Sequence, residues 1–369
     1  MASKPEETPN EALTVHICGP EDRAEQARLF NAVFKKHVDA RALAWRYDDN
    51  PHGQAVSLVS RPPEGDGICG YACSPRRFVP RGEEAHAAPI GETGDVMTHP
   101  DWRKRGIFSS LDARCMEETK RRGWPGVFGL PNRHSAHIFL KIGWDEVGTI
   151  RHRTFLLRSD EHARKERFRE GRLPSLLVPL HVRSCRSKRK KHARLGRGIQ
   201  ARVLDRFPDE VEEISRTREP EFAIMVRRDP AYLNWRFLEA PSGIHRPLGL
   251  YDDTGRFRGY VVVQVPRNGE TKGWLVDLLA DSEEAEAAGI EAGLAVLEEA
   301  GASVVQANAI DGSWWERKLA AVGFLDPRPD NHLIVILYTH DTEHRLTQAA
   351  RVAADWYLTD GDRDDETVG

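Results

Sequence analysis

The 369-residue sequence lacks any long apolar run, because no stretch approaches the ~20 uninterrupted apolar residues that a membrane-spanning helix needs. Its opening residues, MASKPEETPNEALTVHICG, have neither a basic n-region nor an apolar core, so no secretory signal is expected. The five cysteines are odd in number, scattered and without CxxC spacing, which argues against a disulfide framework and against a zinc site. We therefore expect a cytoplasmic protein with reduced thiols, no membrane segment and no bound metal.

The residues that are present predict folded domains. Apolar residues make up 40% of the chain and nine are tryptophans, which excludes a wholly disordered protein. At roughly 100–200 residues per domain, this length predicts two domains, each large enough to bury its own core.

Positive charge is concentrated in the middle of a chain whose net charge is −3. Residues 151–202 contain 17 Lys or Arg residues against four acidic ones. We interpret this stretch as a solvated connector, and the alternative is a docking surface for a phosphate-rich partner. No aromatic residue interrupts the basic cluster at 186–191, so the stacking typical of single-strand binders is missing and a nucleic-acid partner is not expected.

Short matches in a constant order indicate that the second half repeats the first. Ala44-Trp-Arg-Tyr47 matches Asn234-Trp-Arg-Phe237, and Lys141-Ile-Gly-Trp144 matches Ala321-Val-Gly-Phe324. Ordered matches in nearly one register favour a tandem duplication. Strands alternate with amphipathic helices in each copy, which predicts an α/β fold with a mixed sheet in each half. Because the Trp-Arg pair recurs at equivalent places, we expect it to have a structural role.

One segment of the first copy has the features of an anion-binding turn. A short strand, 95–98, is followed by His-Pro, by the basic loop Arg103-Lys-Arg105 with Gly106, and by a helix that begins near Ile107. The first N–H groups of a helix have no intrahelical acceptor, and the helix dipole adds positive potential there. Glycine allows a ligand to approach the backbone closely. The segment therefore predicts a binding site for a pyrophosphate.

This segment resembles the acyl-CoA motif of the GCN5-related N-acetyltransferase (GNAT) superfamily, Gln/Arg-x-x-Gly-x-Gly/Ala. Arg103 and Gly106 match the motif, whereas Phe108 stands at its last, usually small position. Residues 130–144, LPNRHSAHIFLKIGW, resemble the fifth strand and following helix of the same family. The bulky Phe108 and the duplication are similar to the tandem branch of enhanced-intracellular-survival acetyltransferases. The resemblance implies two tandem GNAT-like domains, each with a mixed, mostly antiparallel sheet flanked by helices.

The resemblance also implies a co-substrate, acetyl-CoA, and the residues that bind it. The backbone of the fourth strand would hold the thioester and pantetheine, and the loop and helix start would hold the pyrophosphate. An Asn in the second matching segment commonly contacts pantetheine in this family. The residues implied are Met97, Thr98, Arg103, Lys104, Arg105, Gly106, Ile107, Phe108, Ser109, Asn132 and Ser135.

The expected reaction is direct transfer of an acyl group, most simply acetyl, to a primary amine of a small molecule such as an amino sugar or amino-acid derivative. Such a reaction needs a group that takes the amine proton. Glu92, His99 and His137 lie near the motif, but Asp95 and His134 are our first candidates. Family enzymes often carry a Tyr as the acid, and this chain has Phe139 at that position.

The second copy lacks the basic loop. Its equivalent, residues 280–290, is acidic and would repel a pyrophosphate, so we expect a catalytically silent copy. The predicted organisation is a flexible N-terminus (1–12), a GNAT domain (13–157), a basic connector (158–218), a degenerate GNAT-like domain (219–345) and an acidic tail (346–369). Two alternatives stay open: a FemABX-like aminoacyl transferase that uses aminoacyl-tRNA, and a non-catalytic CoA-binding or scaffold module.

Overall fold

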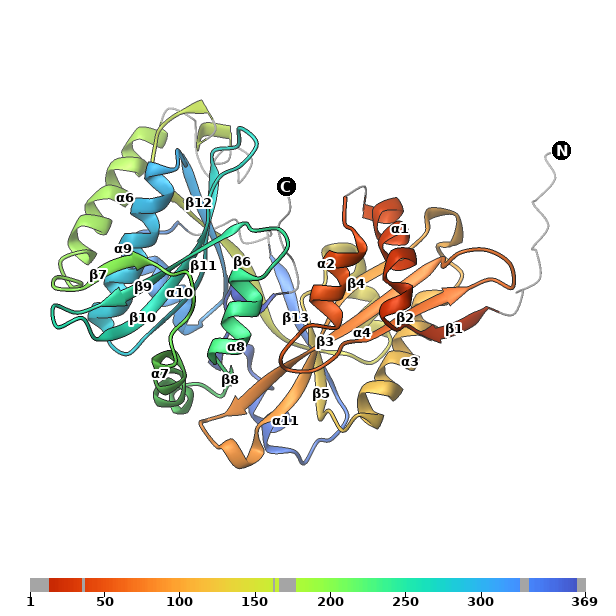
Figure 1. Cartoon of the computed structure of the whole chain (residues 1–369). Helices are drawn as coiled ribbons and strands as arrows, with labels where there is room; N and C mark the ends of the chain where they lie inside the picture. Colours follow the sequence, from red (N-terminus) through yellow and green to blue (C-terminus); the bar gives the residue numbers. More distant parts are fainter. Residues whose placement is uncertain (1–12, 35–36, 162, 166–176, 326–331, 364–369) are drawn as a thin grey trace.

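The computed structural model describes residues 13–34, 37–161, 163–165, 177–325 and 332–363. The segment 1–12, predicted to be flexible, lies outside these residues. Within them, 14 strands form one continuous sheet with helices on its faces (Figure 1). Its main order is β1-β2-β3-β4-β5-β13-β6-β12-β11-β10-β9-β7, and β8 and β14 attach to it through β3.

The first half contains six strands and four helices among the described residues. In chain order they are β1 (Thr14–Ile17), α1 (Arg23–Phe34), α2 (Ala40–Tyr47), β2 (Val56–Arg61), β3 (Cys69–Pro80), β4 (Ala88–Thr98), α3 (Ile107–Arg121), β5 (Gly126–Gly129), α4 (Arg133–Lys141) and β6 (Asp145–Leu156).

The rest of the described chain follows a related order. It comprises α6 (Val178–His192), β7 (Gln200–Val203), α7 (Glu210–Arg218), β8 (Ile224–Val226), α8 (Pro230–Leu233), β9 (His245–Tyr251), β10 (Phe257–Gln264), β11 (Lys272–Ala280), α9 (Glu283–Glu299), β12 (Val304–Ile310), α10 (Trp314–Val322), β13 (Leu333–Thr339), α11 (Arg345–Ala349) and β14 (Trp356–Tyr357). A π-helical turn, Asn234–Leu238, follows α8 directly.

The strand order shows the predicted duplication as an approximate two-fold symmetry. Strands β2 to β5 on one side correspond to β9 to β12 on the other, and α3 and α9 follow the equivalent strands β4 and β11. Each copy contains one parallel pair of neighbouring strands in this part of the sheet, β4 with β5 in the first copy and β11 with β12 in the second. The predicted mixed α/β architecture is therefore confirmed.

The two copies share the centre of the sheet by exchanging a strand. β13, from the second copy, pairs with β5 of the first, and β6, from the first copy, pairs with β12 of the second. β6 and β13 also pair with each other in antiparallel fashion. The two halves are thus joined by continuous backbone hydrogen bonds, and the predicted boundaries at 157 and 219 stay predictions.

The recurring Trp-Arg motif packs across the approximate symmetry axis. The indole N–H of Trp45 donates to the carbonyl of Trp235 at 2.9 Å, and the indole N–H of Trp235 donates to the carbonyl of Trp45 at the same distance. The two rings stack with centroids 4.9 Å apart. This reciprocal pair agrees with the structural role expected from the repeat.

The helices bury the faces that their sequence periodicity predicts. Ile107, Leu111 and Cys115 of α3 are buried against the sheet of the first half. In α9, Ile290, Leu294 and Leu297 are buried against the second half. This packing holds the start of α3 beside the end of β4, where the site is formed.

The described C-terminal part of the basic stretch, residues 177–202, is folded onto the second copy. α6 packs against α10, and β7 pairs with β9 at the sheet edge. Arg189 of α6 binds two glutamates of α9, Glu291 and Glu298, at 2.8 and 2.7 Å. Figure 1 shows α6 on the outer side of the second half, away from α1, α2 and β4.

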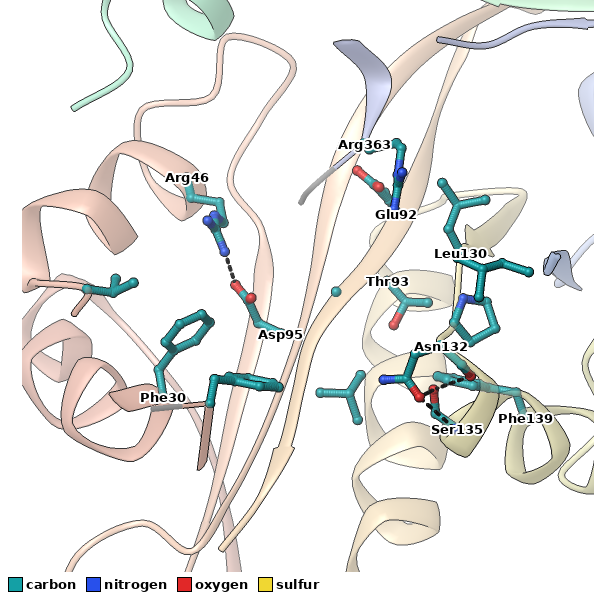
Figure 2. A pocket seen from close by; sticks show the side chains of 16 residues that line it. Phe30, Arg46, Glu92, Thr93, Asp95, Leu130, Asn132, Ser135, Phe139 and Arg363 are labelled. Atoms are coloured by element: carbon teal, nitrogen blue, oxygen red, sulfur yellow. Dashed lines mark hydrogen bonds and ion pairs between the residues drawn. The ribbon is translucent and has the colours of Figure 1, made fainter. Parts of the chain in front are cut away.

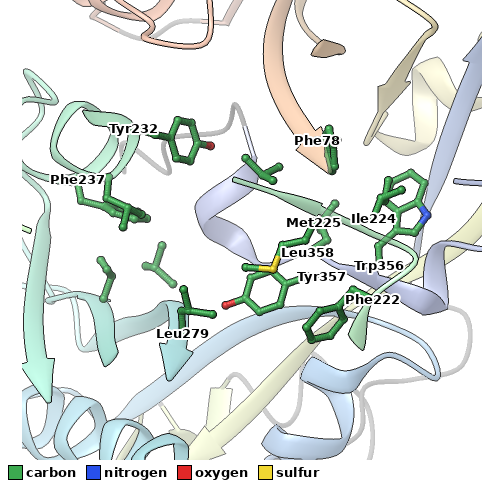
Figure 3. Packing of buried hydrophobic residues seen from close by; sticks show 14 of the residues in the cluster. Phe78, Phe222, Ile224, Met225, Tyr232, Phe237, Leu279, Trp356, Tyr357 and Leu358 are labelled. Atoms are coloured by element: carbon green, nitrogen blue, oxygen red, sulfur yellow. The ribbon is translucent and has the colours of Figure 1, made fainter. Parts of the chain in front are cut away.

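The described part of the acidic tail is packed against the protein. Trp356 and Tyr357 are 1% exposed, and β14, which they form, pairs with β8. Figure 3 shows both rings among Phe78, Phe222 and Met225 in the core between the two halves. Residues 364–369, the end of the predicted tail, lie outside the described residues.

Candidate functional site

The site begins where β4 and β5 separate. Their parallel pairing covers only Gly91–Thr93 and Val127–Gly129, whereas β4 continues to Thr98. On the other side, β3 stays paired with β4, and the register shifts opposite Tyr71, where β4 has one extra residue. Asp95 lies in this bulge with φ of 46°. Bulges of this kind redirect side chains near functional sites, and Asp95 lines the cavity described below.

At the end of β4, the backbone N–H and C=O groups of successive residues point alternately towards β3 and towards the gap between β4 and β5. The N–H of His99 donates to Ile68 beside β3, so alternation directs the backbone groups of Thr98 away from β3. The carbonyl of Thr98 accepts from Arg103 Nε at 3.2 Å, which agrees with this direction. Met97, by the same alternation, faces β3 with its backbone, and its side chain is buried against Leu29 and Phe30. Thr98 is therefore the better placed of the two predicted residues to offer backbone groups to a ligand.

The start of α3 is an open turn. Gly106, with φ of 76°, precedes the helix, and among the described residues no side chain caps its first turn. A Cβ at Gly106 would meet no atom within 4 Å, so glycine serves the backbone angle and leaves the space in front of the helix open. Arg103, Lys104, Arg105 and Gly106 are exposed, whereas Ile107 is buried and anchors the turn. Phe108 and Ser109, which complete the predicted set here, are partly buried in the first turn.

The basic loop is ordered by its own side chains. The Arg105 guanidinium stacks 4.7 Å from the ring centroid of Trp102 and donates to the carbonyl of Asp101. Arg103 is tied to β4 through Thr98. The loop therefore places several positive charges beside N–H groups of a helix start, as a phosphate site requires.

A cavity of about 280 Å³ opens along the separation between β4 and β5 (Figure 2). Its walls come from α1, from β4, from the turn into α4, from β13 and from the C-terminal segment. The lining residues are Phe30, Phe34, Val38, Arg46, Glu92, Thr93, Gly94, Asp95, Val96, Leu130, Pro131, Asn132, Ser135, Phe139, Leu333 and Arg363.

Two carboxylates line this cavity, each next to a guanidinium. Asp95 Oδ2 accepts from Arg46 Nη1 and from the hydroxyl of Tyr47, both at 2.5 Å. Glu92 is 2% exposed and lies 2.9 Å from Arg76 Nη2. Figure 2 shows Arg363 beside Glu92. The cavity thus combines fixed negative and positive groups.

Asn132 and Ser135 lie at the start of α4, on the side of the cavity opposite α1. The Asn132 side-chain oxygen caps the helix by accepting from the N–H groups of His134 and Ser135 at 2.9 and 3.1 Å. Both Asn132 and Ser135 line the cavity. The structure therefore brings these two predicted residues together with Asp95.

Aromatic packing explains why Phe108 and Phe139 occur together. Their rings meet edge to face with centroids 5.2 Å apart, and Phe139 also contacts Trp144 at 5.0 Å. Tyr71 lies 6.2 Å from Phe108. The large residue at the end of the acyl-CoA motif is thus part of an aromatic cluster beneath the cavity.

The predicted histidines lie outside the cavity lining. His134 and His137 are exposed on α4, and His99 lies at the start of the basic loop, where it is 3.6 Å from Asp101. Cys69 is 3.2 Å from Thr98, but burial raises the pKa of its thiol to about 11. That thiol is protonated at neutral pH, which argues against a cysteine nucleophile.

In the second copy, the chain itself fills the corresponding separation between β11 and β12. Thr359 donates to Asp277 on β11 at 2.8 Å, and Asp360 accepts from the N–H of Asn308 on β12 at 2.8 Å. At the start of α9, Ser282 caps the N–H of Ala285, and three glutamates occupy the first turn. Among the described residues, these contacts leave this copy with neither an open separation between the two strands nor an uncapped, basic helix start. The catalytic silence of this copy stays a prediction.

Sequence reasoning missed Arg46 and Arg363, which line the cavity, and the buried Tyr47, which donates to Asp95. Arg46 was assigned a structural role because it recurs as Arg236, and its ion pair with Asp95 shows that it also shapes the cavity. Arg363 belongs to the tail and has no local motif, so no signal near it in the sequence could have placed it in the site.

Two classes of feature are missing from the described part of the chain. No group of three His, Cys, Asp or Glu residues there is arranged to hold a metal ion. None of the helices described is both long and apolar enough to cross a lipid bilayer.

Comparison with known proteins identifies the first copy. Residues 15–147 match the family model of the acetyltransferase (GNAT) domain. No curated protein sequence matches the chain.

Solved structures extend the likeness to the whole chain. A probable N-acyltransferase from Enterococcus faecalis is similar with a TM-score of 0.61 and 13% identity, over 92% of this chain and 74% of that one. A GCN5-related N-acetyltransferase from Kribbella flavida is similar with a TM-score of 0.56 and 13% identity, over 89% of this chain and 71% of that one. A tandem GNAT protein from the clavulanic acid biosynthesis pathway has a TM-score of 0.54 and 14% identity, over 89% of this chain and 98% of that one.

These matches do not distinguish the enhanced-intracellular-survival branch from other tandem GNAT proteins, so that part of the resemblance stays a prediction. The open turn before α3, the separation of β4 from β5 and the similarity to known proteins agree with the other part of the resemblance, the GNAT fold. The chain contains a GNAT acetyltransferase domain in its first half and has a tandem GNAT fold over its length.

Proposed function

We propose that this protein is an acyl-CoA-dependent N-acyltransferase, with acetyl-CoA as donor and a small primary amine as acceptor. The observation that carries the proposal is that β4 separates from β5 along the cavity and that the chain beyond β4 leads, through His99–Gly106, to the uncapped, basic start of α3. A pantetheine arm contains amides, which pair with an open strand edge as a neighbouring strand would. The pyrophosphate then reaches the N–H groups of Ile107, Phe108 and Ser109, with Arg103, Lys104 and Arg105 around it.

The acceptor amine is assigned to the cavity beyond the thioester. We assign Asp95, which is fixed by Arg46 and Tyr47, as the group that receives the substrate ammonium group. We assign Glu92, the other carboxylate of the cavity, as the group that accepts the amine proton, directly or through water. His134 is not placed in the reaction because it is exposed on α4, outside the cavity lining.

The transfer itself requires few groups. The ammonium group first gives a proton to Glu92, and the neutral amine nitrogen then bonds to the thioester carbonyl carbon. The C–S bond breaks to release the CoA thiolate, and the second proton of the nitrogen passes to solvent water. Phe139 supplies no proton, but a thiol with a pKa of about 8.5 leaves as thiolate without an acid near neutral pH. Backbone N–H groups at the end of β4, such as that of Thr98, are the donors available to the developing oxyanion.

The two alternatives make different demands on the structure. An aminoacyl-tRNA donor would use the basic surface of α6, which lies on the outer side of the second copy and away from the cavity (Figure 1). The basic turn follows β4, the strand that lines the cavity, and this placement favours CoA instead. A non-catalytic CoA-binding module would share the turn but would not need the two carboxylates of the cavity.

Calorimetric titration with acetyl-CoA tests the proposal. One CoA is expected per chain, and Arg103→Glu/Arg105→Glu should weaken binding by about 100-fold or more, because two charge-assisted contacts become repulsive. The matched control, Arg114→Glu/Lys120→Glu, reverses two exposed charges farther along the same helix and should change affinity less than about threefold.

A second pair of variants controls for the backbone strain that replacing a glycine of positive φ introduces. Gly106→Asp should abolish CoA binding, whereas Gly123→Asp, at the other end of α3 and also with φ of 76°, should preserve it. Equal affinities in Gly106→Asp and Gly123→Asp would refute the pyrophosphate assignment. Salt-sensitive binding of bulk tRNA without CoA binding would favour the aminoacyl-transferase alternative.

A further inference from the structure

One wall of the cavity is apolar and comes from α1 and the residues that follow it. Phe30 and Phe34 lie one turn apart on α1, and their ring centroids are 4.7 Å apart. Both line the cavity together with Val38. The side-chain amide of Asn31 holds Val38 against α1, because it donates to the carbonyl of Val38 and accepts from its N–H, both at 2.8 Å. The fold therefore builds this wall from defined contacts.

Phe34 keeps part of its surface exposed beside the cavity. It is 38% exposed, whereas Phe30 is 5% exposed and packs with Met97 of β4. Among the described residues, no other Phe, Tyr or Trp side chain is as exposed as that of Phe34. The apolar lining of a pocket receives the apolar part of its ligand. The wall therefore indicates a ligand with an apolar group.

The wall lies on the same side of the cavity as Asp95. In Figure 2, Phe30 and Asp95 lie on one side, and Leu130 and Asn132 lie on the opposite side. Asn132 belongs to the residues expected to hold the pantetheine of CoA, so the side of α1 remains for the acceptor. An acceptor there can direct its ammonium group to Asp95 and its apolar group to Phe34.

The arginines that line the cavity are already bound to carboxylates of the protein. Arg46 donates to Asp95 at 2.5 Å, and the guanidinium of Arg363 lies 3.2 Å from Asp360. Arg363 is anchored in this position, because the residue before it in the chain is buried in an ion pair. A carboxylate on the acceptor would compete with these two groups and would lie in a cavity that Glu92 also lines. An amine without a carboxylate is therefore the better match.

We propose that the acceptor is an apolar primary amine without a carboxylate, and specifically an arylalkylamine, whose ring packs against Phe30, Phe34 and Val38. The inference rests on the proposed acyl transfer and names the class of its acceptor, which differs from the amino sugar or amino-acid derivative expected from the sequence. Aromatic rings pack favourably against one another in offset and edge-to-face arrangements. The hydroxyl groups of an amino sugar would lose water against this wall without gaining a hydrogen bond.

The test compares three amines that differ in these features. The full-length protein, with and without saturating CoA, is titrated calorimetrically with 2-phenylethylamine, with L-phenylalanine, which adds a carboxylate, and with D-glucosamine, which replaces the apolar group by hydroxyl groups. We expect 2-phenylethylamine to bind at least about tenfold more tightly than either of the others, because their additional polar groups lose water without adequate partners. Equal affinities, tighter binding of L-phenylalanine or D-glucosamine, or binding of none of the three would overturn the inference.

Variants assign this preference to the apolar wall. Phe34→Ala, with an unchanged circular dichroism spectrum, should weaken the binding of 2-phenylethylamine about fivefold or more, because the ligand ring loses its aromatic contact. Phe34→Leu should retain part of the affinity. The control, Leu140→Ala, removes an apolar side chain of similar exposure, 40%, outside the cavity lining and should leave the affinity unchanged. An unchanged affinity in Phe34→Ala, or an equal loss in Leu140→Ala, would overturn the inference.

Failure of the acyl-transfer proposal gives a different result. Absence of CoA binding, with the preference for 2-phenylethylamine still measured in the protein alone, would remove the reaction and retain the ligand class. CoA binding without any preference among the three amines would retain the reaction and overturn the ligand class.

Discussion

The buried pair of Asp362 and Arg228 provides the sharpest test of how the tail is bound. Both side chains are 0% exposed, and Arg228 has a second acidic neighbour, Asp277, 3.4 Å from its Nε. Removing one partner of a buried ion pair costs about 3–5 kcal/mol, because the other charge is left in a medium of low polarity. Since Asp277 still compensates part of the charge of Arg228, we expect Asp362→Asn to lower the free energy of unfolding by about 3 kcal/mol, at the lower end of that range.

Equilibrium unfolding in urea, followed by tryptophan fluorescence and by circular dichroism, measures this loss. The control is Asp253→Asn in the exposed turn between β9 and β10, for which a change within about 0.5 kcal/mol is expected. A loss below about 1 kcal/mol in Asp362→Asn, with the control unchanged, would show that the tail is not buried in solution and would refute the reasoning. It would also remove the anchor of Arg363.

Three further predictions concern other parts of the molecule. Trp235→Phe removes the indole donor to the carbonyl of Trp45 and leaves a small void, so urea unfolding should show a loss of about 2–4 kcal/mol; a loss under about 0.5 kcal/mol would contradict the reciprocal pair. Burial lowers the pKa of His340 from 6.5 to about 4, so the unfolded chain binds more protons between these values and stability should fall as the pH falls from 6.5 towards 4. Allowing for solvent screening, that loss is about 1 kcal/mol, and His340→Gln should flatten the stability profile over this range; an unchanged slope would contradict the assignment. Three exposed lysines of α6, Lys188, Lys190 and Lys191, can be replaced by serine. Because this surface lies away from the cavity, kcat and KM for a small amine should not change. A raised KM would instead assign the surface to substrate recognition.

The exchange of β6 and β13 has a consequence for the site. Leu333 of β13 lines the cavity, and β13 lies between β5 and β6. The cavity of the first copy is therefore completed by a strand and a tail segment that the second copy supplies. This arrangement gives a physical reason for retaining a copy whose own cleft is filled.

The sequence by itself determined the features that depend on local order. The spacing of Ile107, Leu111 and Cys115 predicted the buried face of α3, and the Arg-x-x-Gly loop predicted an open helix start. The repeated Trp-Arg motif predicted the duplication, which the strand order confirms. These signals are readable because helix periodicity, capping and positive φ at glycine involve residues that are close in the chain.

Only the tertiary structure decided which residues meet around the cavity. Arg46, Asp95 and Arg363 are far apart in the sequence, and nothing near any of them indicates the others. The acidic tail could be solvated by its composition alone, yet Asp362 is fully buried, because Arg228 compensates its charge. The exchange of β6 and β13 likewise depends on pairing between strands almost 190 residues apart, and burial and charge pairing across such distances select partners that composition and periodicity cannot specify.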